Sequence, residues 1–129
     1  MSARVLVVEN EFMIGLDVSN QLTSAGYEVV GLATSVRKAL RLEPTCDVAV
    51  LDANLRGDSA APMAMALRER GRPFLFVSGF ERAYLPAAFL DEPLLSKPFE
   101  PGELIAAVTR LLSGAHTRED YSRSRPESH

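Results

Sequence analysis

The chain has 129 residues and a mass of 14.1 kDa, which is the length of one ordinary domain and leaves no room for a second domain of normal size. Apolar residues make up 47% of the chain and charged residues 24%, a balance typical of a folded globular domain and not of a disordered or fibrous protein. The net charge of −3, from 14 basic and 17 acidic residues, argues against direct binding of nucleic acid, which depends on clustered lysine and arginine.

Five short apolar runs predict strands that are buried on both faces, because they are rich in Val, Leu and Phe and end at turn residues. In chain order, these runs cover residues 5–8, 29–32, 48–51, 74–77 and, more weakly, 94–95.

The stretches between these runs have apolar residues at helical spacing. The predicted faces are Ile14, Val18, Leu22 and Ala25 before Gly26; Val36, Ala39 and Leu40 before Pro44; Met63, Ala66 and Leu67 before Gly71; and Leu104, Ile105, Val108, Leu111 and Leu112. The last helix is the clearest, because Pro101 suits a first helical turn and Glu103 suits its positive end. Residues 81–93 contain Pro86, so we expect a short or irregular fourth helix there.

This alternation of strands and helices predicts an α/β domain, in which a parallel sheet carries helices on both faces through right-handed crossovers. The domain is expected to span residues 1–113. Residues 114–129 are polar with almost nothing to bury, so we expect a flexible tail.

Cys46 is the single cysteine, which excludes a disulfide within the chain and a thiolate zinc site. The first apolar run meets acidic residues at Glu9, too soon for a signal peptide, and no apolar stretch approaches the ~20 residues of a membrane-spanning helix. We therefore expect a cytoplasmic protein without membrane contact.

Chemically useful side chains follow several of the predicted strands. They are the carboxylates of Glu9 and Asp52, the hydroxyl of Ser78 and the ammonium of Lys97. Ligands bind at the edge where the carboxyl ends of parallel strands meet. Carboxylates suit a divalent cation and lysine neutralises phosphate oxygens, so the sequence predicts a site for a cation and a phosphoryl group.

These residues stand in four motifs that together resemble the receiver domain of bacterial two-component response regulators. The motifs are VLVVENE, AVLDANLRGDS, FVSGF and LLSKPF, and they lie in family order between residues 4 and 112. The resemblance implies a doubly wound, five-stranded parallel sheet in the flavodoxin-like order 2-1-3-4-5. The run PFLFVSGF is further similar to the FAT GUY subfamily of receivers, typically single-domain or stress-response regulators.

By this resemblance, Asp52 is the phosphoacceptor, which attacks a phosphohistidine or a small acyl phosphate and becomes an aspartyl phosphate. Ser78 then binds a phosphoryl oxygen, Lys97 pairs with the phosphoryl group, and the peptide bond before Pro98 is cis. Plainer alternatives exist for each: Asp52 as a loop cap, Ser78 as a loop residue bonded to backbone, and Lys97 as a surface lysine.

The acidic pair of the family is incomplete in this chain. Receivers carry two acids after the first strand, whereas here Glu9 is followed by Asn10, which offers a carbonyl oxygen but no charge. The expected Mg²⁺ ligands are Glu9, Asn10, Asp52 and the backbone carbonyl of Asn54. We therefore expect the affinity for Mg²⁺ to be weakened. Glu11 either compensates for the missing charge as a direct ligand or faces solvent and leaves the affinity low.

The switch region departs from the pattern as well. Receivers place an aromatic ring three residues before the lysine, where this chain has Leu94. Phe80 follows the glycine after Ser78 and is the candidate moving ring; the alternative is an ordinary core or surface aromatic.

Enzymes that use the same sheet edge are not indicated. The sequence lacks both the GxGxxG pattern and the P-loop pattern. Phosphatases of the haloacid dehalogenase type require a second Asp at the position of Asn54. Both histidines, His116 and His129, lie in the tail, so no imidazole is available at the site as a general base. We expect a signalling protein whose only chemistry is its own phosphorylation and slow dephosphorylation.

The predicted function is that of a stand-alone response regulator receiver, which signals through phosphorylation-dependent protein contacts around residues 81–93, the last strand and the last helix. The expected partners are a histidine kinase or a histidine phosphotransfer protein and a downstream regulatory protein, with the chain a monomer or a weak homodimer. The alternative, motivated by Asn10, is a degenerate receiver that binds proteins without phosphorylation.

Overall fold

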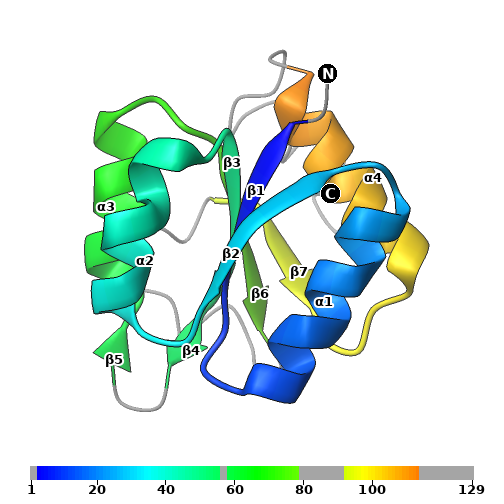
Figure 1. Ribbon diagram of the computed structural model, residues 1–129, viewed down its shortest axis with the longest axis horizontal. Coiled ribbons are helices and arrows are strands. Elements are labelled where there is room, and N and C mark those ends of the chain that lie inside the picture. Colours follow the sequence, from blue (N-terminus) through cyan, green and yellow to red (C-terminus); the bar gives the residue numbers. More distant parts are fainter. Residues whose placement is uncertain (1–2, 56–57, 79–91, 114–129) are drawn as a thin grey trace, which may run out of the picture.

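The computed structural model describes residues 3–55, 58–78 and 92–113, which form a parallel sheet with helices on both faces (Figure 1). The elements are β1 (Arg4–Val8), α1 (Phe12–Ser24), β2 (Glu28–Ala33), α2 (Val36–Leu42), the short 3-10 helix η1 (Glu43–Thr45), β3 (Val48–Asp52), β4 (Asn54–Leu55), β5 (Asp58–Ser59), α3 (Ala61–Glu69), β6 (Phe74–Ser78), β7 (Leu94–Ser96) and α4 (Pro101–Leu112).

The main sheet has five strands in the order β2-β1-β3-β6-β7, and every neighbouring pair is parallel. This is the predicted order 2-1-3-4-5 once the small hairpin of β4 and β5 is set aside, so the predicted fold class is confirmed. The hairpin itself was not predicted. It follows β3 directly, at the edge where the predicted site lies.

Two apolar cores lie on opposite faces of the sheet, because successive side chains of each strand point to opposite sides. In β1, Leu6 and Val8 face the core that α2 and α3 cover, whereas Val5 and Val7 face the core that α1 and α4 cover. Figure 1 shows the same division, with α2 and α3 on one side of the sheet and α1 and α4 on the other. Burial on both faces explains why the strands read as continuous apolar runs.

Glycines end two helices as predicted. Gly26 follows α1 with a φ of 98°, and Gly71 follows α3 with a φ of 70°, a backbone conformation that glycine adopts without a steric penalty. Two predicted core positions are wrong. Ala25 lies past the end of α1 and is exposed, and Leu40 is 40% exposed because only a narrow face of the short helix α2 meets the sheet.

The predicted irregular fourth helix and the predicted tail lie outside the described residues. In the part of the chain that is described, no helix combines the length and apolar character that crossing a membrane requires.

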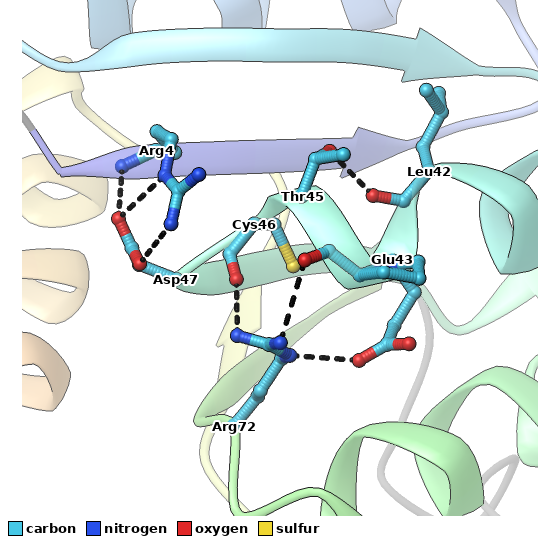
Figure 2. A network of polar contacts seen from close by, with 8 residues as sticks. Arg4, Leu42, Glu43, Thr45, Cys46, Asp47 and Arg72 are labelled. Carbon is cyan, nitrogen blue, oxygen red and sulfur yellow. Dashed lines mark hydrogen bonds and ion pairs between the residues drawn. The ribbon is translucent and has the colours of Figure 1, made fainter.

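The amino ends of the strands are tied together by ion pairs that the sequence did not predict (Figure 2). Arg4 on β1 donates from its side chain to Asp47, with an Nη2–Oδ1 distance of 3.1 Å. The Arg4 backbone N–H donates to Asp47 Oδ2, and the Asp47 backbone N–H donates to the Arg4 carbonyl, both at 2.8 Å. The guanidinium of Arg4 lowers the pKa of the Asp47 carboxyl. The pair therefore joins β1 to the segment that enters β3.

A second network at the same edge surrounds Glu43, whose side chain is 2% exposed. Its Oε2 accepts from Arg72 Nε at 2.8 Å, and its Oε1 lies 3.1 Å from Arg70 Nε. Arg72 also donates to the backbone carbonyl of Cys46 at 2.6 Å (Figure 2). The turn after α2 and the turn before β6 are thereby held together. Cys46 is fully buried, and this burial raises the pKa of its thiol to about 11.

Candidate functional site

The strand pairing brings the predicted site residues to one edge of the sheet. Asp52, the last residue of β3, pairs with Val77, and Ser78, the last residue of β6, pairs with Ser96 on β7. Glu9 directly follows β1, and Lys97 directly follows β7. Four residues that are far apart in the sequence thus lie at the carboxyl ends of adjacent strands.

Two buried carboxylates share one ammonium at this edge. Glu9 is 4% exposed and Asp52 is 6% exposed. Lys97 Nζ donates to Glu9 Oε1 at 3.0 Å and lies 3.9 Å from Asp52 Oδ2. The shorter distance is a hydrogen bond and the longer one is an ion pair without a hydrogen bond. In the described structure, Lys97 therefore binds Glu9 more closely than it binds Asp52.

Backbone hydrogen bonds hold the strand ends in register at the site. The Ala53 N–H donates to the Val77 carbonyl at 2.9 Å, and the Lys97 N–H donates to the Ser78 carbonyl at 2.8 Å. The Ser78 side chain is buried, with the residue 2% exposed. The peptide bond between Lys97 and Pro98 is cis. Asp52, Ser78 and Lys97 are therefore fixed relative to one another by the sheet itself.

The loop after β1 orients Glu9. The backbone N–H of Glu11 donates to Glu9 Oε2 at 3.2 Å, so Glu9 uses one carboxylate oxygen for Lys97 and the other for the loop. Glu11 is the N-cap of α1 and its side chain is exposed, in line with the alternative in which it faces solvent. Asn10 lies between the two acids and is half-buried.

The remaining predicted residues are placed less fully. Asn54 begins the β4–β5 hairpin right after the site, with Ser59 as its pairing partner. Phe80, the candidate moving ring, lies outside the described residues. Leu94 stands where receivers have an aromatic ring, and it is half-buried against the core beneath α2 and α3.

The donor set fits a hard cation such as Mg²⁺, which takes oxygen ligands and needs only one or two protein carboxylates because it keeps several waters. Glu9 and Asp52 supply two such carboxylates. Among the residues that the structure describes, no three acidic, histidine or cysteine side chains gather into a metal cluster. After β1, Asn10 stands where the family pattern has its second acid.

An ion pair at the amino end of β7, away from the site, was missed by the sequence analysis. Arg68 on α3 donates from Nη2 to Glu92 Oε2 at 2.5 Å, and Glu92 is 8% exposed. The contact ties α3 to the residues that lead into β7. Glu92 lies beside Pro93 in a segment without clear periodicity, so its burial left no signal in the sequence.

Solved structures show what this arrangement is similar to. SdrG from Sphingomonas melonis Fr1 is 35% identical, with 86% of this chain and 97% of that chain covered at a TM-score of 0.74. The BeF3-activated conformation of SdrG matches as well, at 36% identity, 87% and 98% coverage and a TM-score of 0.71. The response regulator receiver protein from Sinorhizobium medicae WSM419 is 25% identical over 89% of this chain and 98% of that chain, with a TM-score of 0.75.

The chain belongs to the receiver domains of response regulators. No family model matches it. Among curated proteins, the transcriptional regulatory protein PdtaR from Mycobacterium tuberculosis (strain ATCC 25618 / H37Rv) is 28% identical over 116 residues, which cover 85% of this chain and 57% of PdtaR. This receiver spans about half the length of the curated relatives it matches. Receiver domains of this fold generally bind Mg²⁺ and contact kinases and downstream regulators.

Proposed function

We propose that this receiver accepts a phosphoryl group on Asp52 and signals through protein contacts that depend on that phosphorylation. The observation that carries the proposal is the meeting of Glu9, Asp52 and Lys97 at one sheet edge, with Lys97 Nζ within 3.9 Å of a carboxylate oxygen of each acid. These are the residue types that attack, neutralise and hold a phosphoryl group.

The chemistry follows from the roles of the side chains. A carboxylate oxygen of Asp52 attacks the phosphorus of a phosphohistidine or an acyl phosphate, and the bond from phosphorus to the donor nitrogen or oxygen breaks. Lys97 neutralises charge on the phosphoryl oxygens, and the Ser78 hydroxyl donates a hydrogen bond to one of them. Glu9, Asp52, Asn10 and the Asn54 backbone carbonyl would hold Mg²⁺. When bound, this ion offsets the negative charge between the attacking carboxylate and the phosphoryl group.

Asn10 distinguishes this site from a receiver with two acids after the first strand. With one carboxylate fewer, the cation is held by less negative charge, so phosphorylation requires a higher Mg²⁺ concentration. We propose that Asp52 is phosphorylated at millimolar Mg²⁺ and that the fraction of sites holding Mg²⁺ therefore varies with the Mg²⁺ concentration.

The signal leaves through a surface contact in this proposal. The similarity to SdrG, of which this chain covers 97%, and to the BeF3-activated conformation of SdrG supports a receiver that changes between an inactive and an activated state. The proposed docking face includes β7 and α4. The proposed partners are a histidine kinase or histidine phosphotransfer protein, which supplies the phosphoryl group, and a downstream regulatory protein. The proposed location is the cytoplasm, where such donors act.

The test is incubation with acetyl phosphate, with and without Mg²⁺, followed by intact mass measurement at neutral pH. The expected result is a single phosphoryl adduct that requires Mg²⁺ and is absent from Asp52→Asn. The matched control is Asp17→Asn, which removes an exposed carboxylate on α1 and should be phosphorylated as the wild type is. If a folded wild-type protein gains no adduct at any Mg²⁺ concentration, the degenerate receiver that binds proteins without phosphorylation replaces this proposal.

A further inference from the structure

The outward face of α2 carries three basic side chains that no described carboxylate accompanies. Arg37, Lys38 and Arg41 are exposed on this seven-residue helix, which contains no acidic residue. Within the described part of the chain, every ion pair involves other cations, such as Arg72 and Lys97. The positive charge of α2 is therefore left for a group outside these residues to neutralise.

The three cations are placed where they weaken the helix that carries them. Arg37 and Lys38 lie in the first turn, at the positive end of the helix dipole, where acidic side chains are the stabilising ones. Arg41 follows them by four and three residues, so like charges are neighbours on the helix surface and repel each other. Charges that do not stabilise α2 indicate a contact with another molecule.

Both ends of α2 are nevertheless held in place. At its start, Ser35 Oγ accepts from the Lys38 backbone N–H at 3.2 Å. Directly after its last residue, Glu43 is held by Arg70 and Arg72. A surface that is ordered before binding loses little conformational entropy when a partner docks, so α2 presents its cations at a low cost of binding.

An apolar side chain lies next to the cations. Leu40 is 40% exposed, and it follows Arg37 by three residues, a spacing that places the two side chains side by side on the helix surface. An apolar contact at this position excludes water from the neighbouring charges and strengthens their ion pairs. The face therefore fits a protein segment that combines carboxylates with an apolar side chain.

Two other kinds of anionic partner fit α2 less well. A membrane surface binds a helix through an apolar area larger than one leucine. A nucleic acid would extend beyond the helix, which rises about 10 Å, and would meet the acidic residues that give the chain its net charge of −3. A short acidic segment of a protein can pair with α2 alone.

We propose that the exposed face of α2, formed by Arg37, Lys38, Leu40 and Arg41, is a docking surface for an acidic segment of a partner protein. Carboxylates of the segment pair with the three cations, and an apolar side chain of the segment contacts Leu40. Figure 1 shows α2 on the face of the sheet opposite α1 and α4. This surface is therefore separate from the docking face on β7 and α4.

The test is an NMR titration of the unphosphorylated protein with a short synthetic peptide of glutamates around a central leucine. The backbone amide signals of α2 should shift and saturate, while those of α4 stay fixed. The triple variant Arg37→Gln, Lys38→Gln, Arg41→Gln should raise the dissociation constant about ten-fold, because it removes three exposed ion pairs. A peptide that leaves the α2 amides of the wild type unshifted overturns the proposal.

Single variants separate docking on α2 from a general effect of charge. Arg41→Gln should raise the dissociation constant about two-fold. The matched control is Arg110→Gln, which removes an exposed positive charge from the last turn of α4 and should leave the constant unchanged. Leu40→Ala should raise the constant about three-fold, since part of an apolar contact is lost. Equal losses in Arg41→Gln and Arg110→Gln would mean that the peptide follows net charge alone, which contradicts the proposal.

Two further probes distinguish the kind of partner. Vesicles of phosphatidylglycerol with phosphatidylcholine and a single-stranded oligonucleotide are titrated into the same protein, and the α2 amides should respond to both more weakly than to the peptide. A stronger response to the vesicles or to the oligonucleotide overturns the proposal in favour of a membrane or a nucleic acid.

Urea unfolding tests whether the cations serve the fold instead. The triple variant should unfold at a urea midpoint no lower than that of the wild type, because like charges and the helix dipole oppose these cations. A lower midpoint would mean that the cations stabilise α2, against the proposal. None of these measurements uses a phosphodonor, so they stand whether or not Asp52 is phosphorylated.

Discussion

The two edges of the sheet differ in how many cations accompany their carboxylates. At the amino ends of the strands, the carboxylates of Glu43, Asp47 and Glu92 are matched by four arginines, Arg4, Arg68, Arg70 and Arg72. At the carboxyl ends, two buried carboxylates share the single ammonium of Lys97, and one of them is 3.9 Å from it. These carboxylates at the amino-end edge are thus saturated with counterions, whereas at the carboxyl-end edge Lys97 serves both Glu9 and Asp52.

This difference separates stability from function. A buried carboxylate with two guanidinium partners contributes to folding, because its desolvation is offset by hydrogen bonds on both oxygens. Two carboxylates beside one ammonium repel each other, and that repulsion disappears when a cation arrives. In the proposed function, the receiver therefore binds its cation at one edge and fixes its strands at the other.

The largest effect is expected at the amino-end edge. Glu43→Gln leaves Arg72 and Arg70 facing a neutral side chain in a buried position. It should lower the free energy of unfolding by about 2 kcal/mol, a value reduced from that of a fully buried pair because Arg70 is 57% exposed. Urea unfolding measures the change. Glu69→Gln, on the exposed side of α3, is the control, and an equal shift in both variants would mean that the edge is not saturated as described.

At the carboxyl-end edge, removal of a carboxylate should change the free energy of unfolding in the opposite direction. Asp52→Asn removes one of two carboxylates that share Lys97 and keeps a polar side chain of the same shape. In a chelator solution it should raise the free energy of unfolding by about 1 kcal/mol, since a residue kept for function is often poor for stability. Urea unfolding with and without Mg²⁺ measures this, and a loss of stability would show that Asp52 is as well compensated as Glu43.

A smaller effect is expected from restoring the second acid of the family. Asn10→Asp adds a negative charge next to Glu9, so it should lower the free energy of unfolding without metal by about 0.5 kcal/mol. It should also raise the affinity for Mg²⁺ about ten-fold, which calorimetry measures. Asn20→Asp, at an exposed position of α1, is the matched control. If both variants bind Mg²⁺ equally well, Asn10 does not set the affinity.

The sequence predicted which residues lie at the carboxyl-end edge but not the ion pairs at either edge. Apolar runs predicted the five strands, and the parallel sheet then brought Glu9, Asp52, Ser78 and Lys97 to one edge by topology alone. The shorter distance of Lys97 to Glu9 than to Asp52 could not be predicted, because the two N–O distances differ by less than an ångström.

The amino-end edge escaped prediction for a different reason. Glu43 stands beside Pro44 after a short helix, where a charged residue usually faces solvent. Its burial results from Arg70 and Arg72, which arrive from the far end of α3, and the spacing of these residues has no period that a sequence pattern can detect. The β4–β5 hairpin was missed similarly, because two-residue strands carry no alternation.

The smallest effect is expected at the exposed part of the amino-end edge, where Arg4 lowers the pKa of Asp47. A carboxyl whose pKa is lower in the folded chain than in the unfolded chain stabilises the fold at pH values above its ordinary value of 3.8, and that contribution is lost as the pH falls through the lowered value. Asp47→Asn should therefore flatten the fall in the urea midpoint between about pH 5 and about pH 2. Arg4→Gln removes the cause of the shift and should flatten the same range. If the acid slope persists in both variants, the pair of Arg4 and Asp47 is not the contact that acid breaks.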